Sequence, residues 1–320
     1  MTAPATLLQP YANPPARSGR VGPLSALYDV AAPAKLNAFL HITGRRPDGY
    51  HLLQSVFVLI DWYDTLNFEL RTDGGISRED LHEPAADAAS VEALLPADDL
   101  SVRAAKALQR ASGTALGVHI GLRKRIPAQA GMGGGSSDAA SCLLALQRLW
   151  QVSLPPAQLQ ALALSLGADV PFFLAGGPAW VEGIGDIVER MRLPSARFVV
   201  LKPISGVSTA EIFSSSDLKR DAPAATMRGF SENDGDGDFP GVNSIWKFGR
   251  NDLQPVAQKL CPQIDQALAW LSAQQLEGRM TGSGSAVFAP LPSDKILRVA
   301  PPGCALRICG SLESHPLAGW

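Results

Sequence analysis

The sequence has no long apolar run, few cysteines and little net charge. No stretch of about 18 consecutive apolar residues occurs in the chain, so no membrane-spanning helix is expected. The four cysteines form no Cys-x-x-Cys pair and have no histidine at metal-ligand spacing, which argues against a structural zinc site. A secreted disulfide scaffold is not expected at this length. We interpret Cys142, Cys261, Cys304 and Cys309 as small buried residues in a reducing compartment, the cytoplasm.

Neither sign of charge dominates the chain of 320 residues. It contains 28 lysines and arginines and 30 aspartates and glutamates, for a net charge of -2. This balance excludes nucleic-acid binding that depends on overall positive charge, although a local basic site is compatible with it. The hydrophobic fraction of 46% allows a large buried core and excludes disorder over the whole length. The length predicts two domains or one large one.

The first 27 residues contain five prolines and no acidic residue. A charged start followed by an apolar core is missing, so this leader does not have the pattern of a secretory signal. Its lack of acids is shared with organelle transit peptides, but it has only two arginines and two serines. We interpret residues 1–27 as a disordered extension.

Strands and helices follow each other without a strict β-α-β rhythm. Strands are expected at residues 37–43, 56–60, 65–70, 117–122, 199–201 and 286–289, with a turn at 61–64 and an irregular segment at 74–96. Helices are expected at 98–112, 136–150, 156–166, after Ser208, and at 253–275, with a last helix and strand near the C-terminus. Asp98 is the expected cap of the first helix and Gly113 its stop. This order favours an α+β fold over a doubly wound one.

The segment 217–243 is acidic and rich in glycine, which predicts a surface insertion or mobile loop. A calcium-binding EF-hand loop is the alternative, because Asp234, Asp236 and Asp238 have the spacing of its first ligands. No glutamate follows at the distance that such a loop requires. We therefore do not expect calcium binding here.

The segment Pro127–Ala140, "PAQAGMGGGSSDAA", is the most informative part of the sequence. Its consecutive glycines, Gly133–Gly135, let a ligand approach the backbone closely. Ser136 and Ser137 follow where a helix is expected to begin, and the free N–H groups of a helix start favour an anion. The spacing matches neither a Walker A loop nor a dinucleotide fingerprint. A flexible turn with a serine cap is the alternative, but three glycines cost more chain entropy than a cap requires, so we favour a phosphate site.

Three further segments each have an ordinary structural interpretation when taken alone. Lys35 in "APAKLN" has the features of a solvated surface charge. Asp169 in "LGADVPFF" has the features of a helix cap, although an acid among apolar neighbours is also a candidate base. Gly282 and Gly284 in "RMTGSGSAVF" suit a plain turn or a second close backbone approach.

Taken together and in order, these segments resemble the GHMP kinases. The similar stretches are "PAKLNAFLHITGRRPDGYH" (33–51), "GMGGGSSDAA" (131–140), "LGADVPFFLAGG" (166–177), "GVSTAEIF" (206–213), "NDL" (251–253) and "TGSGSAVFA" (281–289). The resemblance covers about residues 28–315. It implies a two-domain fold, with a ribosomal-protein-like domain at 28–190 and a ferredoxin-like domain at 191–320. The leader and the acidic segment depart from the family pattern.

The resemblance also implies the chemistry. Within the family the chain is most similar to kinases that use ATP and Mg²⁺ to phosphorylate the 2-hydroxyl of a diphosphocytidyl methylerythritol in non-mevalonate isoprenoid synthesis. Lys35 and Asp169 match the catalytic pair. The positions that match the ATP phosphate loop are Pro127, Gly131, Gly133, Gly134, Gly135, Ser136 and Ser137, of which Ser137 is also a candidate Mg²⁺ ligand. The positions expected to contact the acceptor substrate are Asn37, Tyr50, His51, Phe173 and Thr209, with Tyr50 or Phe173 stacking on the base.

Two alternatives remain open at the level of sequence. One is another GHMP kinase, acting on a sugar, homoserine or mevalonate, although "RRPDGYH" favours the cytidyl substrate. The other is a non-catalytic RNA-binding module that would use the basic run Arg123–Arg125. We expect no nucleic-acid partner, no membrane association, and a monomer or a weak homodimer.

Overall fold

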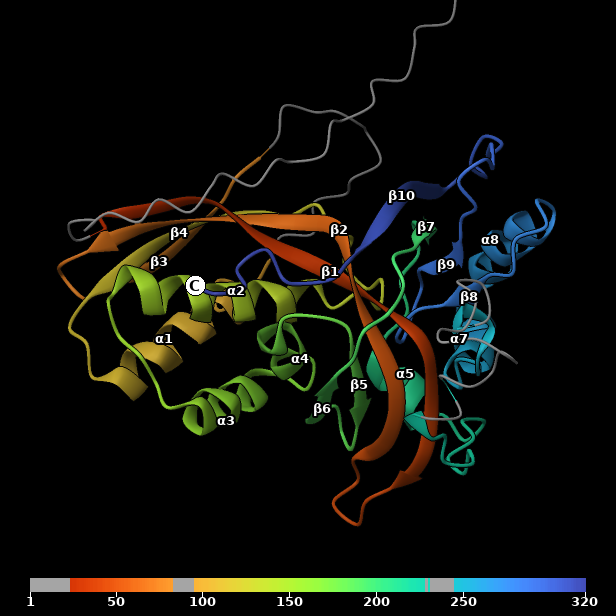
Figure 1. Ribbon diagram of the computed structural model, residues 1–320, viewed down its shortest axis with the longest axis horizontal. Helices are drawn as coiled ribbons and strands as arrows, with labels where there is room; N and C mark the ends of the chain where they lie inside the picture. The colour runs from red at the N-terminus through yellow and green to blue at the C-terminus, as the bar shows by residue number, and fades with distance from the viewer. Residues whose placement is uncertain (1–23, 83–94, 228–229, 231–244) are drawn as a thin grey trace, which may run out of the picture.

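The computed structural model describes residues 24–82, 95–227, 230 and 245–320. Most of the predicted leader and most of the acidic segment therefore lie outside the described residues. Ala26 and Leu27, which were assigned to the leader, instead begin the first strand, β1. Helices lie against a mixed sheet, which confirms the predicted α+β class (Figure 1).

Two long antiparallel strands, β1 (Ala26–Arg45) and β2 (His51–Arg71), run through the molecule. β4 (Gly117–Arg123) pairs with β2, and β3 (Ile76–Asp80) pairs in parallel with β4. The helices α1 (Leu100–Ser112), α2 (Gly134–Leu149) and α4 (Val170–Ala175) lie next to the strands of this half on one side, and α3 (Pro156–Leu166) packs against these helices (Figure 1). A short hairpin of β5 (Ala179–Glu182) and β6 (Ile187–Arg190) pairs with β2 near its start.

The C-terminal half forms a second set of strands. β7 (Arg197–Pro203) lies between β10 (Cys304–Leu312) and β9 (Val287–Pro290), and β9 also pairs with β8 (Arg279–Met280). α7 (Gln254–Leu260) and α8 (Gln263–Ser272) lie on the outer side, and α5 (Thr209–Ser214) lies close to β1 and β2 (Figure 1). β10 also pairs with β2, through Ser311 and Leu312. The two halves are thereby joined in one sheet.

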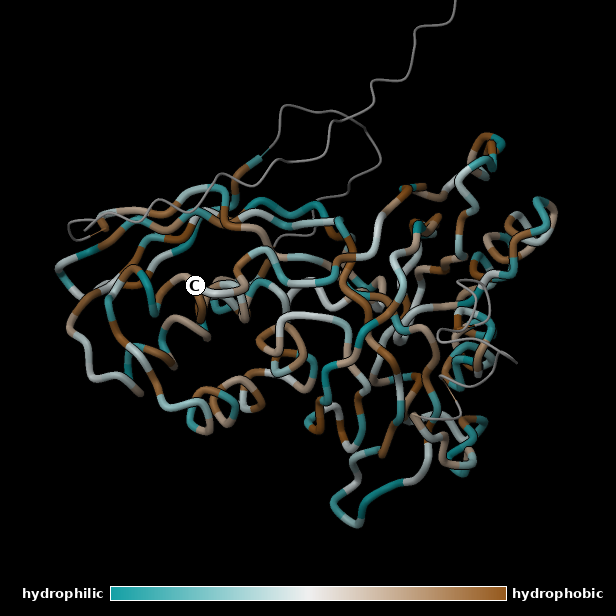
Figure 2. Tube along the Cα trace, in the orientation of Figure 1, coloured by the Kyte–Doolittle hydropathy of each residue, from teal (hydrophilic) through white to brown (hydrophobic). Residues whose placement is uncertain are grey.

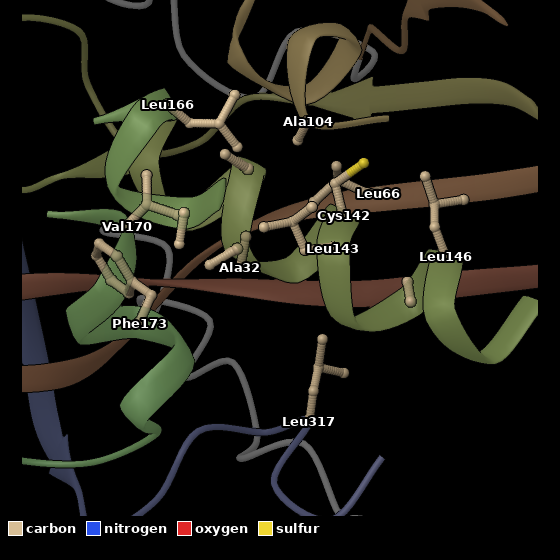
Figure 3. Packing of buried hydrophobic residues seen from close by; sticks show 14 of the residues in the cluster. Ala32, Leu66, Ala104, Cys142, Leu143, Leu146, Leu166, Val170, Phe173 and Leu317 are labelled. Carbon is tan, nitrogen blue, oxygen red and sulfur yellow. The ribbon is translucent and has the colours of Figure 1, made fainter. Parts of the chain in front are cut away.

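A hydrophobic core fills the space between the first sheet and its helices (Figure 3). Leu143 and Leu146 of α2 are fully buried against it, and Cys142 lies beside them, as predicted for a small apolar residue. Leu317, near the C-terminus, packs into the same core. By contrast, the tip of the β1–β2 hairpin, residues 45–50, is hydrophilic and projects from the molecule (Figure 2).

Several local predictions are confirmed. α3 begins at Pro156 and ends at Leu166, as its proline and the following Gly167 predict. Gly113 ends α1 in the left-handed conformation, with φ 69°. The side chain of Ser208 caps α5 by accepting from the backbone N–H of Glu211 at 3.4 Å. The cap of α1 is Asp99 instead of the predicted Asp98.

The predicted turn at 61–64 is wrong, because β2 continues through it. Pro33 pairs with Tyr63 and Ala34 pairs with Ile60, so β2 bulges at this point without reversing. Asp64, a residue that sequence reasoning gave to the turn, is completely buried. Its Oδ1 accepts the backbone N–H groups of Arg125, at 2.6 Å, and Ile126, at 2.8 Å. These long-range bonds fix the bulge.

Three other predictions are also wrong. The expected helix 253–275 is divided into α7 and α8 at Cys261–Pro262, since Pro262 cannot continue the hydrogen-bond ladder. The segment 74–96 contains a strand, β3, which is stabilised by its partner β4 and not by its own sequence pattern. The described residues between β9 and β10 contain no helix.

Candidate active site

Lys35 and Asp169, which are far apart in sequence, lie together. Lys35 is in the middle of β1, and its Nζ lies 3.5 Å from Oδ2 of Asp169. Asp169 occupies the N-cap position of α4, but its side chain makes no capping hydrogen bond. The predicted alternative of a simple helix cap is therefore wrong for this carboxylate. Its side chain is 30% exposed, so a ligand can reach it, whereas that of Lys35 is 4% exposed.

The buried amine of Lys35 is held from three sides. Its Nζ donates to Oδ1 of Asn37 at 2.6 Å and lies 4.4 Å from the centre of the Phe57 ring. Burial lowers the pKa of Lys35 from its ordinary value, and the negative charge of Asp169 opposes this shift. Asn37 is itself buried; its amide donates to Oγ of Ser55 at 2.9 Å, and its Oδ1 also accepts from Oγ1 of Thr281 at 3.2 Å. Asn37 therefore holds Lys35 in place.

The predicted phosphate loop lies directly beside this pair. The backbone N–H of Lys35 donates to the carbonyl oxygen of Met132 at 3.0 Å. Gly133 is the N-cap of α2 and has φ 71°, in the left-handed region. A Cβ at Gly133 would lie 3.0 Å from the ring of Phe173 and 3.2 Å from Cγ of Lys35. Glycine is required here because the loop turns against these two side chains.

The start of α2 has the properties of an anion site. Its N-cap, Gly133, has no side chain to satisfy the free N–H groups of the first turn. Gly135 is exposed and Ser136 is half-exposed, so the first turn is open to a ligand. Pro127, which is half-buried, begins the loop, and Gly134 packs against Ile126. The helix that follows is 16 residues long, so its dipole adds to the attraction for phosphate.

Ser137 has a buried hydroxyl without a hydrogen-bond partner in the described part of the chain. A hydroxyl oxygen is a suitable ligand for Mg²⁺, which prefers oxygen atoms. Buried polar atoms normally have partners, so this oxygen fits a site for a metal ion or for an oxygen of the nucleotide.

The C-terminal glycine motif supports the phosphate loop from behind. Gly131 has φ 70°, and a Cβ there would lie 2.1 Å from the carbonyl oxygen of Thr281. Gly282 is equally close to the loop, since a Cβ at Gly282 would lie 2.5 Å from the carbonyl oxygen of Gly131. The backbone N–H of Ser285 donates to the carbonyl oxygen of Gln129 at 2.9 Å. The second of the two interpretations of this motif, a close backbone approach, is therefore confirmed.

The residues predicted to bind the acceptor substrate lie around the β1–β2 hairpin and α5. Tyr50 is 61% exposed at the hairpin. The ring of His51 lies 4.8 Å from that of Phe213 in α5, tilted by 33°. Oγ1 of Thr209, at the start of α5, is 2.7 Å from Oγ of Ser283 in the glycine motif. The contact between Thr209 and Ser283 places the residues predicted to bind the acceptor substrate next to the glycine motif that supports the predicted phosphate loop.

A cavity of about 400 Å³ lies between the hairpin and the turn that precedes Asp169. It is lined by Arg46, Asp48, Tyr50, Leu164, Ser165, Leu166, Gly167, Ala168 and Ile184. Phe173, by contrast, is completely buried and packs edge-on against Phe172. It presents no free ring face to a base, so Tyr50 is the stronger stacking candidate of the predicted pair.

Sequence reasoning missed a buried charge cluster beneath the loop. Nζ of Lys124 bonds to Oδ2 of Asp138 at 2.6 Å and also to Asp64. Burial raises the pKa of Asp138, and the nearby Asp64 adds to the shift, while Lys124 opposes it. Lys124 is part of the basic run that motivated the RNA-binding alternative, but its amine binds these two aspartates. Only the fold reveals this, since three distant segments contribute.

Comparisons with known proteins agree with the geometry. Residues 99–177 match the profile of the GHMP kinases N terminal domain, and residues 239–300 match that of the GHMP kinases C terminal. The chain is 65% identical to 4-diphosphocytidyl-2-C-methyl-D-erythritol kinase of Polaromonas sp. (strain JS666 / ATCC BAA-500), over 97% of this chain and 99% of the relative. It is 67% identical to the enzyme of the same name from Polaromonas naphthalenivorans (strain CJ2), over 93% and 97%.

Solved structures give the same result. A crystal structure of 4-(cytidine 5'-diphospho)-2C-methyl-D-erythritol kinase matches with a TM-score of 0.63 and 32% identity, covering 81% of this chain and 88% of that one. A homoserine kinase from Cytophaga hutchinsonii matches with a TM-score of 0.64 and 15% identity, over 93% and 98%. At that identity the second match supports the fold alone.

Proposed function

The chain belongs to the GHMP kinases, in the family of 4-diphosphocytidyl-2-C-methyl-D-erythritol kinases, and we propose that it carries out that family's reaction. It transfers the terminal phosphoryl group of ATP to the 2-hydroxyl of 4-diphosphocytidyl-2-C-methyl-D-erythritol, giving the 2-phosphate and ADP in non-mevalonate isoprenoid biosynthesis. The observation that carries the proposal is the Lys35–Asp169 pair, 3.5 Å apart and bonded through β1 to the glycine loop. A cytoplasmic location and a monomeric or weakly dimeric state stay predictions.

The glycine loop and the start of α2 would hold the phosphates of ATP. Phosphoryl transfer passes through a loose transition state, so catalysis depends on positioning and on neutralising charge. The free N–H groups after Gly133 and the dipole of α2 supply fixed positive charge at this point. The close packing of Gly131 against the carbonyl oxygen of Thr281 would help to hold the loop in this position, as phosphoryl transfer requires.

Asp169 would accept the proton of the acceptor hydroxyl, and Lys35 would stabilise the charge that develops between donor and acceptor. The carboxylate of Asp169 is free of capping bonds and partly exposed, as a base for an incoming hydroxyl must be. The ammonium of Lys35 lies 3.5 Å from Oδ2 of Asp169, within reach of charge that develops at the transferred group. Asn37 keeps the ammonium in place through its 2.6 Å hydrogen bond.

Ser137 is the residue that would hold Mg²⁺ together with the nucleotide, because its buried oxygen has no other described partner. The ion would share the negative charge of the phosphates. The roles of Asp169 and Lys35 described above do not depend on this contact.

The test compares Asp169→Asn with Asp294→Asn, which changes an exposed aspartate in the turn after β9. We expect the first variant to keep its fold and lose about 10²–10⁴-fold in kcat, the contribution of a positioned base. The control should retain wild-type turnover. Assays with the cytidyl substrate, homoserine and mevalonate as acceptors would identify the substrate class. Wild-type kcat in Asp169→Asn, or no turnover of the cytidyl substrate by the wild type, would contradict the proposal.

A further inference from the structure

His51 is in contact with an arginine that lies far away in sequence. His51 is the first residue of β2, and Arg220 lies in the segment that follows α5. Nε of Arg220 donates to Nε2 of His51 at 2.9 Å. The same histidine ring lies against Phe213, 4.8 Å away. His51 is thus fixed by one directional hydrogen bond and one ring contact.

The direction of this hydrogen bond determines which histidine nitrogen carries the proton. A guanidinium group remains protonated and has no acceptor atom, so it can only donate. Nε2 of His51 must therefore carry a lone pair, and in the neutral ring the proton is on Nδ1. Burial, together with the positive charges of Arg220 and Arg45, lowers the pKa of His51 below its ordinary value. The neutral ring is consequently the stable form near pH 7.

Arg220 is itself held in a fixed orientation. Its Nη1 donates to the carbonyl oxygen of Leu218 at 2.8 Å. Its Nη2 donates to the carbonyl oxygens of Phe213, at 3.1 Å, and Ser215, at 2.9 Å. These three bonds point Nε at His51, so the guanidinium is attached to the backbone around α5. Within the part of the chain that the structure describes, Nδ1 of His51 has no hydrogen-bond partner, and its proton is available to a ligand.

We propose that Arg220 is a positioning residue that determines base specificity, by holding His51 in the form that donates from Nδ1. This inference rests on the proposed function and on the prediction from sequence that His51 contacts the acceptor substrate. A donor at this point fits the ring nitrogen N3 of cytosine, which carries a lone pair. Uracil has N3–H at the same position, so two hydrogen atoms would face each other. Arg220 would therefore exclude a uridine substrate without touching the base.

The first experiment uses the wild-type chain alone. Nitrogen chemical shifts of ¹⁵N-labelled histidine at pH 7.5, assigned by comparison with His51→Gln, report which ring nitrogen is protonated. We expect a protonated Nδ1 and an unprotonated Nε2 for His51. A protonated Nε2 would overturn the proposal. This result is independent of turnover, so it separates failure of the inference from failure of the proposed function.

The second experiment compares Arg220→Met with Arg220→Gln and with Arg192→Met, a control that removes an exposed positive charge from the loop after β6. Wild-type kcat/KM should favour the cytidine substrate over its uridine analogue. We expect Arg220→Met to reduce this ratio at least tenfold, mainly through KM, and to give a mixed histidine tautomer. Arg220→Gln, whose amide can donate to Nε2, should recover part of the ratio, and Arg192→Met should not change it.

Two outcomes of the variant experiment would contradict the proposal. One is an unchanged cytidine-to-uridine ratio in folded Arg220→Met. The other is an equal loss of activity with both substrates, which would indicate that Arg220 only supports the local fold. If Arg220→Met does not fold, the tautomer of the wild-type ring decides the matter, since a protonated Nε2 of His51 refutes the proposal by itself.

Discussion

The backbone N–H of Lys35 donates to the carbonyl oxygen of Met132 at 3.0 Å. This single bond attaches the strand that carries the proposed catalytic lysine to the loop that would carry the phosphates of ATP. The side chain of the same lysine reaches Asp169, 3.5 Å away. A displacement of the loop would therefore move the lysine, so the proposed phosphate loop and the proposed catalytic pair are linked through β1.

Replacing Lys35 with methionine should separate activity from stability. The amine is buried and its pKa is lowered by burial, so its charge is costly to the folded state. Methionine fills a similar volume beside Phe57 and removes that cost. We expect about a 10²–10³-fold loss of kcat, as for the removal of one group that stabilises transition-state charge, with no loss of thermal stability. Kinetics and melting curves would check this, and a variant that unfolds would contradict it.

Gly131→Ala should be far more harmful than Gly113→Ala. Both glycines have a left-handed φ, of 70° and 69°, so both substitutions introduce the same backbone strain of roughly 1–2 kcal/mol. A Cβ at Gly113 meets nothing within 4 Å, whereas one at Gly131 would lie 2.1 Å from the carbonyl oxygen of Thr281. We expect the additional stability loss, and a raised KM for ATP, only in Gly131→Ala. Equal urea midpoints for the two variants would rule out the close approach.

Ser137→Ala and Ser141→Ala should affect different properties, although both serines are buried in α2. We expect the first to change the Mg²⁺ requirement and the second to change stability. The hydroxyl of Ser141 donates to the carbonyl oxygen of Ala31 at 3.0 Å, so its removal should cost about 1 kcal/mol of stability. The hydroxyl of Ser137 has no described partner, so its removal should leave stability unchanged and raise the Mg²⁺ concentration needed for half-maximal turnover. An unaltered Mg²⁺ requirement in Ser137→Ala would count against this serine as the ligand.

His315 should make the fold sensitive to acid. Burial lowers its pKa to about 4, and its Nδ1 accepts the backbone N–H of Leu317 at 3.1 Å. The unfolded chain binds a proton near pH 6.5, so stability is complete above that pH and falls as the pH decreases toward 4. His315→Asn keeps an acceptor for Leu317 and removes the titration. The stability difference between wild type and variant should change by about 2–3 kcal/mol between pH 7.5 and 4.5, measured by urea unfolding. A difference that is constant with pH would refute this assignment.

Local sequence signals predicted many of the elements. Pro156 and Gly167 predict the ends of α3, and Gly113 the end of α1, because caps and stops depend on neighbouring residues. Elements that are fixed by partners far away in the sequence were not predicted correctly. The "DWYD" segment has the composition of a turn, yet β2 passes through it because Asp64 bonds to the backbone of Arg125 and Ile126.

The candidate site shows the same division. The motifs identified Lys35, Asp169 and the glycine loop as separate segments, and their resemblance to a family linked them. The sequence did not identify Arg220 or the Lys124 cluster, since their partners come from other elements. Nor did it indicate that Phe173 would be buried under Gly133. The role of each predicted residue in catalysis or binding stays a prediction until the variants are measured.

By itself, the sequence determined both ends of α3 and the end of α1, where the backbone must bend at glycine, and which residue types were available for phosphoryl transfer. These properties arise from the conformational preferences and chemistry of adjacent residues. Only the tertiary structure decided that the carboxylate of Asp169 makes no capping bond to α4 and that the amine of Lys35 is buried beside it. It also decided that Arg220 bonds to the ring of His51. Such relationships arise when long strands and distant loops pack together, because burial and hydrogen-bond direction depend on neighbours in space.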